Sequence, residues 1–131
     1  MEEVGMMQNN MEILEKIKQI VADILDLEEE KIGMDTYLIR DLGAESIDLL
    51  ELAVSLNAAF QTEIRDDDIF LRKLRFYLEE AKTTGRDHHA FLAKQYPFLE
   101  DSRIREILND LNGGAVLRIS DLVCYIAHHQ Q

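Results

Sequence analysis

The residues of this chain best suited to chemistry lie in one stretch, DLGAESIDLLEL, at positions 41–52. In it, Ser46 follows a turn around Gly43 and stands at the predicted start of an amphipathic helix. A hydroxyl at that place is accessible and can carry a phosphodiester, which the amides and dipole of a helix N-terminus favour by about 0.3–1 kcal/mol. From this stretch alone, a site of attachment and a simple N-cap are both open for Ser46.

No second set of residues suggests catalysis or metal binding. An enzyme site needs a nucleophile with a placed base, or a metal, and neither pattern accompanies the serine. The His pairs at 88–89 and 128–129 are adjacent, not four apart as two ligands on one helix face would be. The acids at 66–68 lack the alternating ligands of a calcium loop and fit the first turn of a short helix. We therefore predict no catalytic residue, no metal and no enzymatic activity.

Length and composition predict a small, acidic helical domain. The chain has 131 residues, of which 47% are hydrophobic, and this suits one domain with a single core. A net charge of −12 argues against nucleic-acid binding and favours partners with basic surfaces. The single cysteine, Cys124, excludes an internal disulfide and is expected to pack as a small hydrophobe. The absence of a membrane-spanning run and of a secretory signal predicts a cytoplasmic protein, which we expect to be a monomer.

Apolar spacing predicts an all-α chain. Residues 1–10 are expected to form a flexible tail, followed by a helix over 11–25, a long loop over 26–43 and a helix over 46–60. A last helix begins near Ser120 or Asp121. The helix over 46–60 has a second apolar stripe beside the one expected to be buried, and a helix apolar on two faces must bury or use the excess.

Residues 71–115 add a second helical region. Gly85 can end its first helix, Asp87 can cap a second, and Ser102 can cap a third that ends near Gly113. One group of apolar residues is either the core of this region or a docking surface: Phe91, Tyr96, Phe98 and Leu99. Residues 71–112 carry eight basic and seven acidic side chains, so this region does not continue the acidic surface of the first half.

Three phrases, in order, resemble the acyl carrier protein family. DLGAESIDLLEL is close to the family's DLGADSLDxVEL; FQTEI, at 60–64, resembles its FxxEI; and ISDLVCYI, at 119–126, resembles VGDLVDYI in its last helix. The resemblance covers about residues 11–69 and resumes near Val116. It implies a four-helix bundle with additional inserted helices. The single carrier domain would then span 11–131, with its core at 11–70 and 116–131 and a helical insertion at 71–115.

The resemblance also implies roles for individual residues. Ser46 would carry a covalent 4′-phosphopantetheine arm, taken from coenzyme A, on which acyl groups are held as thioesters. The residues that would be recognised by partner enzymes are Glu45, Ile47, Asp48, Leu50, Glu51 and Val54. The residues that would line or adjoin an acyl pocket are Leu49, Ala53, Leu56 and Phe60. The implied partners are a phosphopantetheinyl transferase and acyl-loading, condensing or acyltransferase enzymes with basic surfaces.

The chain departs from the family pattern in ways that bear on its partners. Arg65 replaces the family's Pro after EI, and Arg118 replaces its Thr before the last helix. The insertion at 71–115 replaces a short connection, which suggests a dedicated carrier for fatty-acyl or lipid or lipopolysaccharide synthesis. Two alternatives remain: a polyketide or aminoacyl carrier, and a helical protein-interaction module without a prosthetic group.

Overall fold

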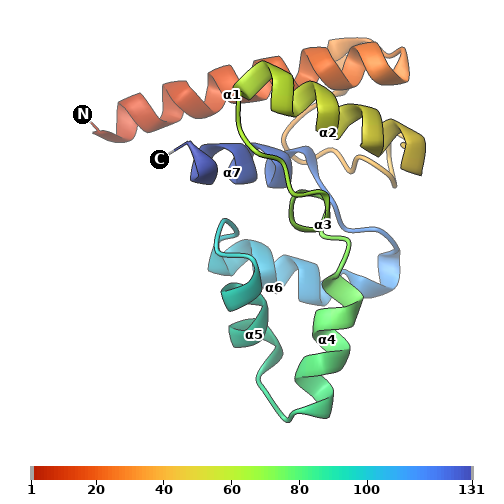
Figure 1. The fold of residues 1–131 in the computed structure, drawn as a ribbon, viewed down its shortest axis with the longest axis vertical. Helices are drawn as coiled ribbons and strands as arrows, with labels where there is room; N and C mark the ends of the chain where they lie inside the picture. The colour runs from red at the N-terminus through yellow and green to blue at the C-terminus, as the bar shows by residue number, and fades with distance from the viewer. Residues whose placement is uncertain (1, 131) are drawn as a thin grey trace.

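A computed structural model describes the backbone of residues 2–130 and the side chains of residues 9–130. Over this part of the chain there are seven α-helices, two short 3-10 helices and no strand, which confirms the all-α prediction. Helix α1 (Glu2–Leu25) packs against α2 (Ser46–Phe60) and α7 (Ile119–His129). Figure 1 shows these three helices together at one end of the molecule, with the short α3 (Asp66–Ile69) below α2.

The insertion forms a group of three helices at the opposite end (Figure 1). These are α4 (Leu74–Thr83), α5 (His88–Gln95) and α6 (Asp101–Asn109), of which α5 contacts both others. A 3-10 helix over Leu111–Gly113 then leads the chain back to α7. Both ends of the insertion therefore lie beside the helices that match the carrier pattern.

Local sequence explains most helix boundaries. Helix α2 has the predicted bounds, with its buried face formed by Leu49, Leu52, Ala53 and Leu56. The predicted Asp87 cap of α5 is confirmed, since its Oδ2 accepts a hydrogen bond from the Ala90 N–H at 2.9 Å. The predicted Ser102 cap of α6 is wrong: Glu100 is the N-cap, because the turn closed by Leu99 N–H and the Tyr96 carbonyl starts the helix earlier.

The start of the first helix also differs from the prediction. We expected a flexible tail over residues 1–10 and a helix from Met11, whereas α1 begins at Glu2. The segment contains no Pro, and Met, Glu and Gln favour helix, so nothing in it ends α1 before Met11. The polar composition of residues 2–10 therefore did not predict their helical backbone.

One cluster of buried apolar side chains includes residues from α1, α2 and α7 and from the insertion. Three of the four residues for which core and docking surface were both open belong to it, namely Tyr96, Phe98 and Leu99, and Phe91 is also buried. The docking-surface interpretation is wrong for these four, because at most 7% of each is exposed. Edge-to-face ring contacts continue the cluster from Tyr96 to Phe98 at 5.9 Å and from Phe98 to Tyr125 of α7 at 5.2 Å.

The long loop before α2 is held by the segment that precedes α7. Its Leu38 N–H donates to the Leu117 carbonyl at 3.1 Å, and the Ile119 N–H donates to the Thr36 carbonyl at 3.0 Å. Ile32 and Leu38 are buried beneath it. None of the helices in residues 2–130 combines the length and the apolar character that crossing a bilayer requires.

Candidate functional site

Ser46 is the first residue of α2, and its side chain is exposed. The N-cap of this helix is Glu45, so the interpretation of Ser46 as an N-cap is wrong. The Glu45 backbone N–H donates to Asp48 Oδ2 at 2.8 Å, which is one half of a capping box. Because Glu45 and Asp48 cap the helix, the serine hydroxyl is left available at its N-terminus.

The turn before Ser46 depends on a glycine. Gly43 has φ of +72°, in the left-handed region that side chains disfavour. Its N–H donates to the Ile39 carbonyl at 2.9 Å, and the Ala44 N–H donates back to the Leu38 carbonyl at 3.2 Å. Asp41 closes the start of the same turn, since its Oδ2 accepts from the Tyr37 N–H at 2.9 Å. The DLG of the motif thus fixes where α2 begins.

The surface of α2 next to Ser46 is both acidic and apolar. Three large hydrophobic residues are mostly exposed there: Ile47 at 71%, Leu50 at 61% and Val54 at 67%. Glu45 and Glu51 are exposed among them. Asp48 is only half-buried and is engaged in the cap, so it differs from the other two acids.

Three of the four residues expected to line an acyl pocket lie on the buried face of α2. Leu49 and Ala53 are each 6% exposed, Leu56 is fully buried, and Phe60 is half-buried near the C-terminal end of the helix. Of the four, Leu49 also lines an open groove that begins at Ser46.

This groove has a volume of about 440 Å³ and is walled largely by the insertion. Besides Ser46, Leu49 and Ile39, it is lined by residues 70–72, 74–75, 111 and 114–117. The sequence did not predict the insertion side of the groove, because its residues lie about 25 and about 70 positions from Ser46 and carry no local pattern. The charge of 71–112, which differs from that of 40–70, was the only available signal.

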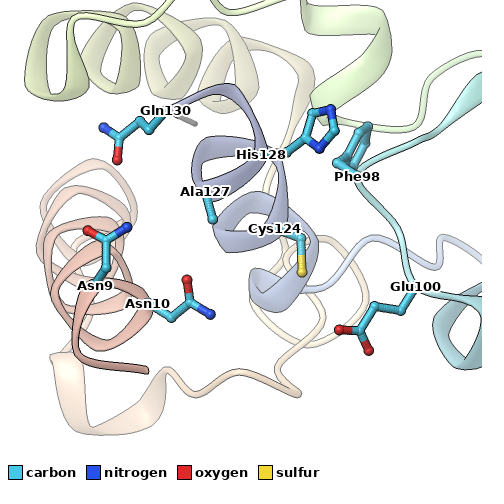
Figure 2. Close-up of a pocket in the computed structure, with 8 residues that line it drawn as sticks. All are labelled: Asn9, Asn10, Phe98, Glu100, Cys124, Ala127, His128 and Gln130. Carbon is cyan, nitrogen blue, oxygen red and sulfur yellow. The ribbon is translucent and has the colours of Figure 1, made fainter. Parts of the chain in front are cut away.

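A second pocket, of about 270 Å³, lies between α1, α7 and the segment before α6. Figure 2 shows Asn9 and Asn10 of α1 on one side of it and Glu100 on another, with Cys124 on α7. Burial raises the pKa of the Cys124 thiol to about 11, so it is protonated at neutral pH and a poor nucleophile. Among residues 2–130, no group of three or more His, Cys, Asp or Glu is arranged to hold a metal.

Comparison with known proteins identifies the family. The sequence profile described as "Phosphopantetheine attachment site" matches residues 15–73, which include Ser46, its turn and the whole of α2. Acyl carrier proteins from three strains of Clostridium perfringens (SM101, ATCC 13124 and strain 13) are each 41% identical over 56 residues, which is 43% of this chain and 74% of theirs. The chain belongs to the acyl carrier protein family. No solved structure matches it.

Membership means that this carrier contains a phosphopantetheine attachment site and is not itself catalytic. It also implies a phosphopantetheinyl transferase and client enzymes as partners. The residues around Ser46 fit the group, because an exposed hydroxyl stands at a helix N-terminus beside an open groove.

The two substitutions in the family pattern have structural roles in this carrier. The Arg65 N–H donates to the Tyr125 hydroxyl of α7 at 3.1 Å, a bond that a proline at this position has no N–H to make. Arg118 donates to the Tyr37 hydroxyl at 3.1 Å and to Glu106 Oε2 of the insertion at 3.0 Å. Arg118 thus ties the loop before α2 to α6.

Proposed function

We propose that Ser46 carries the phosphopantetheine arm and that the protein presents acyl groups, held on it as thioesters, to biosynthetic enzymes. The exposed hydroxyl at the first residue of α2, inside the matched attachment segment, carries this proposal. Residues 11–131 would work as one carrier domain in the cytoplasm, as a monomer. Support for the single domain comes from the buried cluster that α1, α2, α7 and the insertion share.

The roles of the chain's residues follow from their positions. The Ser46 oxygen would bond to phosphorus of coenzyme A and lose its proton, with adenosine 3′,5′-bisphosphate as the leaving group. The N–H groups at the start of α2 favour the negative charge of the resulting phosphodiester. The bound group supplies the thiol on which acyl chains are carried.

Partner enzymes would contact α2 beside the serine. The proposed recognition surface consists of Glu45, Ile47, Asp48, Leu50, Glu51 and Val54. Its exposed acids would attract enzymes with basic surfaces, and its exposed apolar side chains would be buried on contact. Such partners include the transferase and acyl-loading, condensing or acyltransferase enzymes.

The pathway proposed is fatty-acyl, lipid or lipopolysaccharide synthesis by a dedicated set of enzymes. Two observations support it: the identity of 41% to acyl carrier proteins over the attachment region, and an insertion that adds a wall to the groove at Ser46. A polyketide or aminoacyl carrier would differ in the acyl-loading enzyme that accepts the holo form.

The experiment is intact-mass measurement after incubation with coenzyme A and a phosphopantetheinyl transferase. We expect one added phosphopantetheine in the wild type, none in Ser46→Ala, and full addition in the control Ser102→Ala, since Ser102 is an exposed serine on α6. No added mass with a transferase active on another carrier would identify an interaction module instead. Attachment at any other serine, found by peptide mapping, would also contradict the proposal.

A further inference from the structure

We propose that the groove beside Ser46 holds the arm attached to that serine together with a fatty-acyl chain, and that the insertion forms the wall that retains them. This inference rests on the function proposed above. It assigns to residues 71–75 and 111–117 a ligand-binding role that the attachment segment alone does not provide.

The position of the groove is the first support. Ser46 itself lines it, so a group attached to the hydroxyl starts inside the groove. Residues from both ends of the insertion, Leu71 and Leu74 on one side and Leu111 on the other, line it with Ser46. A hydrogen bond from Arg75 Nη2 to the Leu111 carbonyl, at 3.0 Å, joins these two ends.

The charge of the lining is the second support. The net charge of the chain is −12, yet the groove is lined by two arginines, Arg72 and Arg75, and by no acidic residue. A phosphodiester on Ser46 carries one negative charge, and arginine is well suited to pair with phosphate oxygens. Elsewhere around the serine, Glu45 and Asp48 would repel that charge, so the arginine side is the favoured one.

The apolar lining is suited to an acyl chain. Leu71, Leu74, Val116 and Leu117 line the groove, and at most 6% of each residue is exposed. Burying methylenes against such side chains removes apolar surface from water, which is favourable. A chain that leaves the phosphate near Arg72 and Arg75 therefore has an apolar surface beside it.

The alternative route, between α1 and α2, is closed in this structure. Leu52 and Leu56 are 2% and 0% exposed, and the space between Val21, Leu38 and Leu52 is about 10 Å³. That is close to the smallest cavity that can hold one water molecule. The helices would have to part to admit a chain there, whereas the groove of about 440 Å³ is already open.

Nuclear magnetic resonance on the full-length protein tests this directly. The probe is an octanoyl group on the arm, and amide shifts are compared between the octanoyl and unacylated holo forms. We expect the largest differences at residues 70–75 and 111–117. Amide-shift differences confined to α1 and the buried face of α2, or no shift differences at all, would overturn the proposal. Failure of Ser46 to be modified would instead refute the proposed function, so the two failures are distinguishable.

Matched variants provide a second measurement, the rate of spontaneous thioester hydrolysis followed by intact mass. Leu111→Glu places a charge in the groove, and Phe76→Glu places the same charge on the exposed side of α4. We expect hydrolysis to quicken about fourfold for each methylene released from the groove in Leu111→Glu. Phe76→Glu should match the wild type. Equal rates in both variants would contradict the inference.

A further variant, Arg72→Glu, tests the charge without altering a buried side chain or the Arg75 hydrogen bond to Leu111, since Arg72 is exposed. We expect its octanoyl-dependent shifts at residues 111–117 to fall to less than half of those in the wild type. Arg105→Glu, an exposed arginine on α6 outside the groove, is the control. Unchanged shifts in Arg72→Glu would remove this arginine from the proposal.

Discussion

Arg103 of the insertion and Asp121 of α7 form a buried bidentate ion pair. Arg103 Nε lies 2.7 Å from Asp121 Oδ1, and Nη2 lies 2.8 Å from Oδ2. The same Oδ2 accepts the Arg118 N–H at 2.9 Å, which caps α7, and Arg103 Nη2 also donates to the Val116 carbonyl at 2.6 Å. One carboxylate therefore starts the last carrier helix and binds the insertion.

Removal of this carboxylate should destabilise the whole domain. In Asp121→Ala the Arg103 guanidinium, with 9% of its side chain exposed, loses its charged partner, and breaking such a pair costs about 3–5 kcal/mol. Urea unfolding would measure the loss, with Arg105→Ala on the exposed side of α6 as the control, expected to change stability by at most about 0.5 kcal/mol. Equal stabilities for the two variants would show that the Arg103–Asp121 pair does not hold the insertion to α7.

Charge reversal on α2 should separate recognition from folding. Glu51→Lys alters an exposed acid and should slow modification by the transferase most at low salt, because exposed charges are screened over about 8 Å at physiological ionic strength. Its melting temperature should change little. Stopped-flow or steady-state transferase kinetics at several salt concentrations would measure this, and rates independent of both charge and salt would exclude the acidic surface from recognition.

Asp48→Lys should behave differently from Glu51→Lys. Asp48 Oδ2 accepts the Glu45 N–H at 2.8 Å, so its loss also removes part of the helix cap, at about 0.5–2 kcal/mol. Asp48→Asn, which keeps an acceptor oxygen, is the matched control. A thermal melt of Asp48→Lys identical to that of Glu51→Lys would mean that the cap contributes nothing to stability.

The features that the sequence predicted are those determined by neighbours along the chain. The bounds of α2 follow from an apolar period and from the turn at Gly43, whose positive φ a glycine adopts easily. The cap at Asp87 is equally local. The three phrases that resemble the acyl carrier protein family then indicated the family, which the spacing of apolar residues alone does not indicate.

The features that were missed depend on contacts between distant segments. In the sequence, Arg103 is one of several charged residues on an amphipathic helix. It is buried against Asp121 because α6 approaches α7 in the fold. The groove forms because residues 70–75 and 111–117 come together at Ser46. The start of α1 was missed because a polar segment without Pro can still continue a helix.

A second ionic contact, at Asp110, should make stability depend on acid pH. Hydrogen bonds from Tyr37 and Arg40, at 2.7 and 3.1 Å, together with the nearby charge of Arg118, hold the Asp110 pKa below its ordinary value. A carboxylate with a lowered folded pKa stabilises the fold above the ordinary Asp pKa of about 3.9, and the contribution is lost as pH falls through the lowered value.

Asp110→Asn should therefore lower the melting temperature at pH 7, and the difference in melting temperature from the wild type should become smaller in acid. Asp35→Asn, at an exposed loop position, is the control, and a constant difference across pH would contradict the assignment.

Replacement of residues 71–115 by a short linker should not leave an intact carrier. The deletion removes Arg103 from Asp121 and Phe98 from the Tyr125 ring, 5.2 Å away, and exposes the side of α7 that faces the insertion. Loss of one large buried side chain costs about 1.5–3 kcal/mol, and several are lost here, out of a total stability of about 5–15 kcal/mol for a typical domain. We expect a broad or absent thermal transition and binding of a hydrophobic dye, both measurable on the purified protein. The full chain with Lys82→Ala, a substitution at an exposed position of α4, should melt close to the wild type. A deletion variant that unfolds cooperatively at the wild-type temperature would mean that the insertion is merely appended to an independent carrier core.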